Sequence, residues 1–203
     1  RRVMRLFITG GSSYLGKTLA PLARRAGHTV AYTTFRNSLP DVPGGLMLDL
    51  RRPTAVAAAV ASFQPDAIIH TAGSNRVDDM TSVIVDGTRH VVAAAQEANA
   101  RLIHLSTDSI FDGKTPPYAE TAVPSPLNAY GRAKAQAEAL VAHHPDHVII
   151  RTSLIYGFDE MDHSTSWIAA ALRAGEPVTL FTNQFRQPVW VQTLSAACLE
   201  LAQ

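Results

Sequence analysis

Short apolar runs alternate with longer segments of helical character along most of the chain. Six of these runs are rich in Val, Ile, Leu or Phe, which is typical of strands. They cover residues 5–9, 28–34, 46–48, 67–70, 101–105 and 148–151. Alanine-rich or amphipathic segments between them predict helices over residues 15–26, 53–63, 82–98 and 129–143. Strands that alternate with helices in this way predict an α/β fold with a parallel, doubly wound sheet.

The carboxyl-terminal part of the chain is less regular. We expect a helix over residues 167–174, short strands at residues 178–181 and 187–190, and a final helix that Thr193 caps. No internal repeat or low-complexity linker interrupts the sequence, so no second independent domain is expected.

Composition describes an ordinary soluble globular protein. The 203 residues are 46% hydrophobic and 17% charged, with a formal net charge of +1. Lys and Arg form no cluster longer than a pair, which argues against a nucleic-acid surface, and pairs such as Arg51–Arg52 are expected to be solvated. The single cysteine, Cys198, excludes an internal disulfide and falls in an apolar pattern typical of the core. No apolar run is long enough to span a bilayer and no signal peptide is evident, so a cytoplasmic enzyme is expected.

One loop-and-helix segment holds the side chains best suited to chemistry. Thr107 follows a predicted buried strand, and a Gly- and Pro-rich loop leads to a helix that Asn128 or Ser125 can cap. Tyr130 and Lys134 lie four residues apart on that helix and therefore share one face. If this face is directed toward the strand end, a hydroxyl, a phenol and an ammonium group converge there. The arrangement predicts a site for proton transfer.

The chemistry of this trio depends on the pKa of the phenol. A free tyrosine loses its proton near pH 10, which is too high for a good acid or base at neutrality. A neighbouring ammonium favours the phenolate and lowers that pKa, and a cationic nicotinamide ring would add to the effect. Thr107 would hydrogen-bond the substrate oxygen. Taken alone, however, a Tyr and a Lys at this spacing are also a common surface pair.

The companions of the trio resemble a known family. The strings STDSIFDG, PYAET and SPLNAYGRAKAQAE are similar in order and spacing to the extended short-chain dehydrogenase/reductases, and most closely to their dTDP-4-dehydrorhamnose reductase branch. The resemblance implies a Rossmann-type fold, with Thr107 as the catalytic hydroxyl residue, Tyr130 as the acid and Lys134 as its helper. The family has asparagine where Asp86 stands, and that asparagine supports the lysine through a water, so this departure leaves the proton relay in question.

A glycine-rich turn follows the first predicted strand and opens the first helix. Such a turn lets the backbone approach a pyrophosphate, which rests on the helix amino terminus. The expected spacing of three glycines is met by Gly10 and Gly16 but has Ser13 at its centre. The expected cofactor loop comprises Gly10, Ser12, Ser13, Tyr14, Leu15 and Gly16.

The end of the second strand indicates which dinucleotide binds. An acidic residue there holds the ribose of NAD, whereas a basic residue meets the 2′-phosphate of NADP. Phe35, Arg36 and Asn37 follow this strand, so NADP(H) is preferred with Arg36 as the clamp, and NAD(H) is the alternative. An arginine that merely lies at the surface is the competing interpretation of Arg36.

The resemblance also implies contacts along the rest of the cofactor. Asp49 and Leu50 correspond to the family's pair beside the adenine, and Thr71, Ala72 and Gly73 to the lining of the nicotinamide ribose, where Tyr130 and Lys134 also contact the cofactor. His70 is expected to be a packed core histidine, because no second ligand is spaced to share a metal with it.

The resemblance divides the chain into a cofactor-binding and catalytic part, residues 1–152, and part of a substrate-binding lobe packed on it, residues 153–203. Candidate substrate contacts are Asp108, Ser109, Asn128, Arg151 and Trp167. The resemblance implies an NADPH-dependent reductase of a carbonyl substrate, such as a nucleotide-linked 4-keto sugar or another small carbonyl compound. The alternative is a cofactor-binding regulatory subunit that resembles the β subunit of methionine adenosyltransferase. A monomer or homodimer is expected, with no nucleic-acid or membrane partner.

Overall fold

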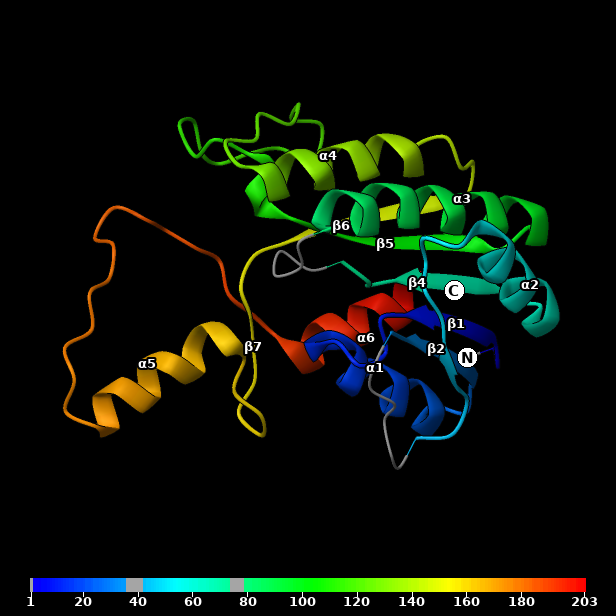
Figure 1. The fold of residues 1–203 in the computed structure, drawn as a ribbon, viewed down its shortest axis with the longest axis horizontal. Helices are drawn as coiled ribbons and strands as arrows, with labels where there is room; N and C mark the ends of the chain where they lie inside the picture. The colour runs from blue at the N-terminus through cyan, green and yellow to red at the C-terminus, as the bar shows by residue number, and fades with distance from the viewer. Residues whose placement is uncertain (1, 36–41, 74–78) are drawn as a thin grey trace.

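The computed structural model describes residues 2–35, 42–73 and 79–203. Its centre is a six-stranded parallel sheet with the strand order β3-β2-β1-β4-β5-β6 (Figure 1). The strands are β1 Arg5–Thr9, β2 Thr29–Thr34, β3 Gly45–Met47, β4 Ala67–His70, β5 Arg101–Thr107 and β6 His147–Thr152. The order runs outward in both directions from β1 and β4. This topology confirms the predicted doubly wound α/β fold.

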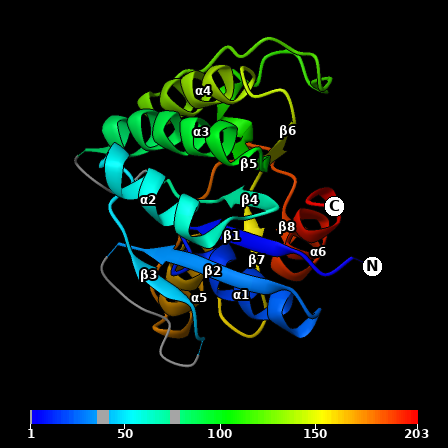
Figure 2. The same cartoon turned by 90° about the vertical axis from the view of Figure 1, so that its right-hand side faces the viewer.

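Helices cover both faces of the sheet (Figure 2). One layer contains α1 Tyr14–Arg25 and α6 Val191–Leu201, and the other contains α2 Pro53–Phe63, α3 Gly87–Ala98 and α4 Ala129–Val141. Alternation along β1 shows why both layers form. Leu6 and Ile8 pack toward α1 and α6, whereas Phe7 between them packs toward α2 and α3. Because both faces of the central strands are apolar, both must be covered.

The predicted helix over residues 82–98 is present but divided. It begins as a π-helical turn, η1 Ser82–Asp86, and continues as α3. Cys198 and His70 are buried, as predicted. His70 hydrogen-bonds Thr9 through Nδ1 and Thr88 through Nε2, so its polar atoms are satisfied inside the core. None of the described helices is long and apolar enough to cross a membrane.

The carboxyl-terminal part differs from the sequence prediction. The strand predicted at residues 178–181 is wrong, because this exposed segment has no strand to pair with in the described chain. Of residues 187–190 only β8 Val189–Trp190 is a strand, and it pairs with β7 Ile155–Tyr156. The final helix begins at Val191 with Trp190 as its N-cap, so the predicted Thr193 cap is also wrong.

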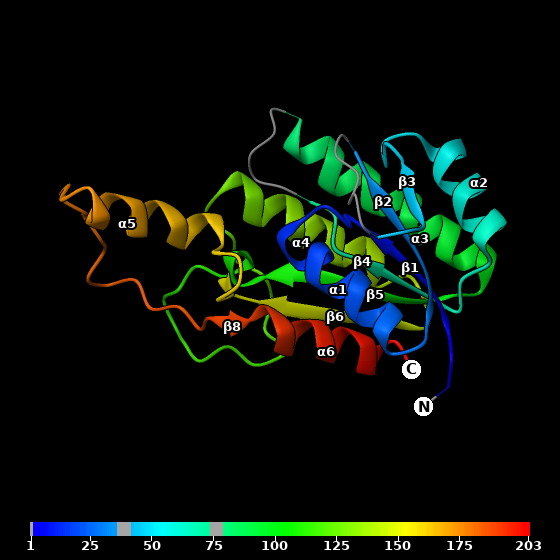
Figure 3. The same cartoon turned by 90° about the horizontal axis from the view of Figure 1, so that it is seen from below.

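Two different environments therefore occur after residue 152. Helix α5, His163–Arg173, and the segment that follows it extend away from the sheet (Figure 3). In contrast, α6 packs against α1, and its residues Leu194 and Cys198 belong to the same buried cluster as Leu15 and Leu19. The end of the chain is thus an integral part of one helical layer.

Candidate active site

Tyr130, Thr107 and Lys134 meet at the carboxyl end of β5. The side chain of Asn128 accepts a hydrogen bond from the Gly131 amide at 2.7 Å and so starts α4 immediately before Tyr130. The phenol of Tyr130 lies near the Thr107 hydroxyl, which influences its pKa. One turn further along α4, Lys134 Nζ donates to the backbone carbonyl of Leu105 at 2.6 Å. The helix cap and the strand end together determine where the three side chains meet.

Lys134 is buried, with 4% of its surface exposed. Burial lowers the pKa of its ammonium from 10.5 to about 8, and the negative charge of Glu138 partly opposes this shift. Its second hydrogen-bond partner is His104 Nε2, at 3.2 Å. The lysine is therefore a cation near neutral pH that is easily deprotonated at mildly alkaline pH.

The phenol of Tyr130 shifts in the direction opposite to the sequence prediction. Burial raises its pKa above 10.0, and the charge of Asp108 adds to the rise, while the hydrogen bond from Thr107 opposes it. Lys134 is hydrogen-bonded to β5 instead and is not among these influences. The expected lowering by Lys134 is therefore not supplied by the protein alone, and Tyr130 is poised as a protonated acid.

Gly10 and Gly16 allow the tight turn and the close packing that open α1. Gly10 has φ of +72°, a conformation that favours glycine, and a Cβ there would lie 2.9 Å from the amide nitrogen of Ala72. A Cβ on Gly16 would lie 2.3 Å from the Gly10 carbonyl oxygen. Ser13 stands at the position of the central glycine. Its backbone is extended, with φ of −69°, so the conformation at this position does not require glycine. Its Oγ accepts from the Gly16 amide at 3.0 Å and caps α1.

The remaining loop residues fix the turn in place. Leu15, in the first turn of α1, is buried in the core, and Ser12 lies partly exposed in the turn before the helix. Tyr14 donates its hydroxyl proton to the Glu160 carbonyl at 2.6 Å, and Lys17 forms an ion pair with the Glu160 carboxylate at 2.9 Å. The cofactor loop is thereby connected to the segment after β7.

The loops after β1 and β4 also meet, as the parallel sheet requires. Thr71 Oγ1 donates to the Thr9 carbonyl at 2.7 Å, and the Ala72 amide donates to Thr9 Oγ1 at 3.3 Å. Gly73 follows directly. This places the candidate nicotinamide-ribose lining beside Gly10, at the same sheet edge as the Tyr130 trio.

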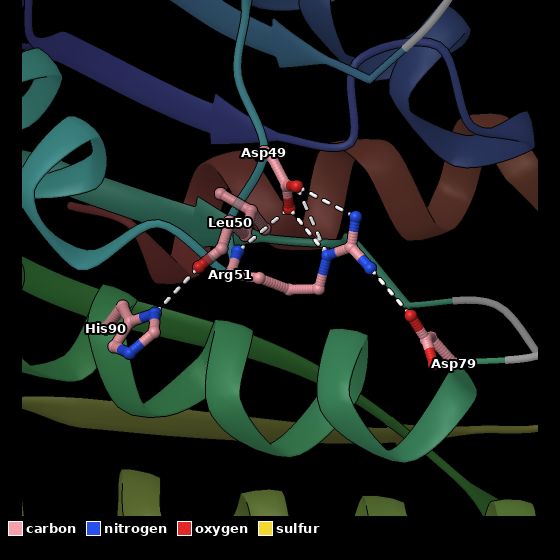
Figure 4. A network of polar contacts seen from close by, with 5 residues as sticks. All are labelled: Asp49, Leu50, Arg51, Asp79 and His90. Carbon is pink, nitrogen blue, oxygen red and sulfur yellow. Dashed lines mark hydrogen bonds and ion pairs between the residues drawn. The ribbon is translucent and has the colours of Figure 1, made fainter.

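The carboxylate expected beside the adenine is held by an arginine (Figure 4). Arg51 donates from Nε and Nη2 to the two oxygens of Asp49, at 2.9 and 2.8 Å, and from Nη1 to Asp79 at 2.8 Å. The hydrogen bond from Arg51 lowers the pKa of Asp49. The guanidinium carbon also lies 5.6 Å from the centre of the Phe35 ring. Arg51 was predicted to be a solvated surface residue, and its side chain is partly exposed, but it also forms ion pairs with Asp49 and Asp79.

Leu50 and Arg36 were also predicted to contact the cofactor in this region. Leu50 is buried, and its carbonyl accepts from His90 Nδ1 at 2.8 Å. Arg36, the predicted clamp for the 2′-phosphate, lies outside the described residues.

The candidate substrate residues occupy different environments. Asp108 binds Arg186, whose Nε and Nη2 donate to the two carboxylate oxygens at 2.9 and 3.1 Å. The Ser109 amide donates to Thr107 Oγ1 at 3.2 Å, so its backbone orients the Thr107 hydroxyl. Asn128 acts as the helix cap described above. Trp167 is 49% exposed on α5, apart from the sheet.

Arg151 is engaged within the protein. It forms a bidentate pair with Glu138 and donates to the carbonyl of Glu120 at 2.9 Å. Glu138 retains only 5% side-chain exposure. The pair connects β6 to α4 behind the trio, so in this structure Arg151 supports the site rather than facing open space.

Sequence reasoning missed three residues around the trio: His104, Arg186 and Glu138. His104 lies within an otherwise apolar strand, which was a detectable signal. No local pattern indicated Arg186, because it reaches Asp108 from a distant segment of the chain. Asp86 forms an exposed ion pair with Arg89, which is the main cause of its lowered pKa.

Comparisons with known proteins agree with this geometry. Residues 4–203 match the family described as the RmlD substrate binding domain. A "dTDP-4-keto-6-deoxy-D-glucose reductase" of Streptomyces niveus is 31% identical over 98% of this chain and 69% of its own length. A crystal structure of dTDP-4-dehydrorhamnose reductase from Bacillus anthracis, in complex with NADP, aligns over 100% of this chain and 71% of its own, with a TM-score of 0.85 and 26% identity.

A further relative is named as a subunit of a different enzyme and not as a reductase. "Methionine adenosyltransferase 2 subunit beta" of Danio rerio is 29% identical over 98% of this chain. The chain spans 64% of that protein's length. The match of nearly the whole chain to one family, together with the motifs and the sheet, leads to one conclusion. The chain belongs to the RmlD substrate binding domain family, within the extended short-chain dehydrogenase/reductases.

Proposed function

We propose that this chain is an NADPH-dependent reductase that converts the carbonyl group of a nucleotide-linked 4-keto sugar to an alcohol. The observation that carries the proposal is the convergence of Tyr130, Thr107 and Lys134 at the end of β5, where the ammonium of Lys134 is buried and donates to the Leu105 carbonyl at 2.6 Å. The names of the Streptomyces niveus and Bacillus anthracis relatives support the substrate class.

Each residue of the trio has a distinct role in this proposal. NADPH, when bound, supplies the hydride that is added to the carbonyl carbon. Thr107 donates a hydrogen bond to the substrate oxygen, and Tyr130 transfers its proton to that oxygen, so the C=O group becomes CH–OH. Its raised pKa keeps Tyr130 protonated before transfer. The ammonium of Lys134 favours the phenolate that remains.

The cofactor assignment rests on the loop geometry. Gly10 and Gly16 allow the tight turn and the close packing that bring the amino terminus of α1 to the place of the pyrophosphate, and Thr71, Ala72 and Gly73 would lie beside the nicotinamide ribose. Arg51 neutralises Asp49, which reduces repulsion of a 2′-phosphate. We therefore prefer NADP(H), with Arg36 as its clamp and NAD(H) as the alternative, and the NADP complex of the Bacillus anthracis relative supports this choice.

In this proposal the two parts of the chain have different roles. Residues 1–152 bind the cofactor and carry the trio, and residues 153–203 contribute part of the substrate-binding lobe. Within the latter, α6 anchors the segment to α1, while α5 and its neighbours extend from the sheet. Asp108, Ser109 and Trp167 remain candidate substrate contacts. A cytoplasmic location and a monomeric or homodimeric state accompany this proposal.

The decisive experiment measures loss of NADPH absorbance with a panel of nucleotide-linked 4-keto sugars and simple carbonyl compounds, with NADH in parallel. We expect turnover with a nucleotide-linked 4-keto sugar and a lower KM for NADPH than for NADH. Turnover only with simple carbonyls would contradict the substrate class. Tight NADPH binding without turnover on any compound would favour the second candidate function, a regulatory subunit. That candidate is based on the similarity to the methionine adenosyltransferase β subunit.

The pKa of Lys134 predicts how the reaction depends on pH. Below about pH 8 the lysine is charged, and above it the charge is lost. Since kcat/KM for NADPH reports groups of the free enzyme, it should fall by about tenfold per pH unit above that pKa. In Lys134→Arg, which stays charged, any remaining activity should show no such fall. A decline that begins only near 10.5, the ordinary lysine value, would contradict the assignment.

A further inference from the structure

His104 is the buried partner of Lys134. It lies on β5, is fully buried, and its Nε2 is 3.2 Å from Lys134 Nζ. On its other side, its ring centre lies 5.1 Å from that of His70 on β4. Nothing in the proposed reaction uses His104 directly, since it is fully buried and contacts Lys134 and His70.

The contact with Lys134 determines the protonation of His104. An ammonium group has hydrogen-bond donors only, so Nε2 of the histidine must accept. The ring is therefore neutral and carries its proton on Nδ1. That Nδ1–H is buried and has no hydrogen-bond partner among the described residues. A buried N–H without a partner is unfavourable. The contact with Lys134 therefore selects the Nδ1–H tautomer, although this tautomer leaves the Nδ1–H group of His104 without a partner among the described residues.

We propose that His104 is a positioning residue, which holds the Lys134 ammonium in place by accepting a hydrogen bond at Nε2. The inference rests on the proposed function, because Lys134 matters only if Tyr130 transfers a proton. With the Leu105 carbonyl as the second acceptor, His104 fixes two of the three N–H directions of Lys134. Asp86, at the position where the family's asparagine supports the lysine, is instead paired with Arg89.

The other charged and titratable groups around Lys134 are already matched. Glu138, on the same helix, is bound to Arg151 of β6. His70 of β4 is held between Thr9 and Thr88, and burial lowers its pKa to about 3, so it remains neutral. Burial raises the pKa of Tyr130, so the phenol stays neutral. Burial also lowers the pKa of His104, and the charge of Lys134 lowers it further.

The direct test is nuclear magnetic resonance of the protein labelled with nitrogen-15 at its histidines, with His104 assigned by its loss in His104→Gln. We expect a neutral His104 with the proton on Nδ1 and no titration between about pH 5.5 and 7.5, where a free histidine would titrate. A proton on Nε2, or a titration in this range, would overturn the proposal. This result does not depend on turnover, so it is separate from a failure of the proposed function.

Two variants then test the effect on Lys134. His104→Leu removes the acceptor at similar size, whereas His104→Gln offers an amide oxygen near the position of Nε2. Loss of an acceptor destabilises the ammonium, so in the leucine variant the alkaline decline of kcat/KM should move to lower pH by about one unit, with a loss of about fivefold at pH 8. The glutamine variant should recover most of that loss.

Thermal unfolding followed by circular dichroism establishes whether each variant is folded. Identical pH profiles for the parent and a folded His104→Leu would overturn the proposal, as would equal losses in the leucine and glutamine variants. If the leucine variant does not fold, the histidine tautomer observed by nuclear magnetic resonance in the parent protein decides whether the proposal holds.

Discussion

Tyr130→Phe should lose turnover by about 10²–10⁴-fold while it still binds NADPH, because only the transferable proton is removed. The ring packs against the small buried cluster of Ile84, Ala133 and Ala137, and phenylalanine retains those contacts. Thr107 keeps its hydrogen bonds to Asp108 and the Ser109 amide, so the strand end should not rearrange. Turnover is measured by NADPH absorbance, and cofactor binding by the change in NADPH fluorescence.

Tyr118→Phe is the matched control for this change. Tyr118 donates to Asp112 at 2.7 Å and stacks on Phe111 in the loop before α4, so the same oxygen atom is removed near the site but outside the trio. We expect kcat to stay close to that of the parent. A Tyr130→Phe variant that retains more than about a tenth of parental turnover would refute the acid role of Tyr130.

Arg151→Leu should lower the free energy of unfolding by about 3–5 kcal/mol, because it leaves the Glu138 carboxylate buried without its partner. The two side chains are 24% and 5% exposed, and the closest N–O distance is 2.8 Å. The guanidinium also satisfies the Glu120 carbonyl, which would lose that donor. Urea unfolding followed by circular dichroism, with linear extrapolation to water, measures the change.

Arg89→Leu provides the comparison. Its ion pair with Asp86 has side chains that are 52% and 44% exposed, so its loss should cost no more than about 1 kcal/mol. Replacing both members of the buried pair, Glu138→Leu with Arg151→Leu, should recover part of the loss, since no lone charge stays buried. An effect of Arg151→Leu as small as that of Arg89→Leu would show that solvent reaches Glu138.

Local patterns were sufficient for most of the sheet and for the trio. Apolar runs such as AIIH at residues 67–70 must be buried on both faces, and a parallel sheet is the arrangement that allows it. Gly10 could be assigned to the cofactor loop because a glycine-rich turn that follows a strand directly and opens a helix is the local pattern of a pyrophosphate site. In each case the physical requirement is met within a few consecutive residues, so the sequence shows it.

Predictions failed or were incomplete where the decisive contact comes from a distant part of the chain. Residues 178–181 have the composition of a strand, yet a strand forms only if a neighbour offers its backbone. Arg51 belongs to an arginine pair that could equally face solvent, and its ion pair with Asp79 depends on how the loops after β3 and β4 approach each other. Spacing along the chain carries no information on such approaches.

The sequence by itself placed Tyr130 and Lys134 on one helix face and Thr107 after a buried strand, and its resemblance to a family singled out these three as the trio. Only the tertiary structure decided their electrostatics. Burial lowers the pKa of Lys134 and raises that of Tyr130, and His104 and Leu105 take the hydrogen bonds of the lysine. A pKa depends on the solvent and charges around a group in space, and these are set only when β5 and α4 pack together.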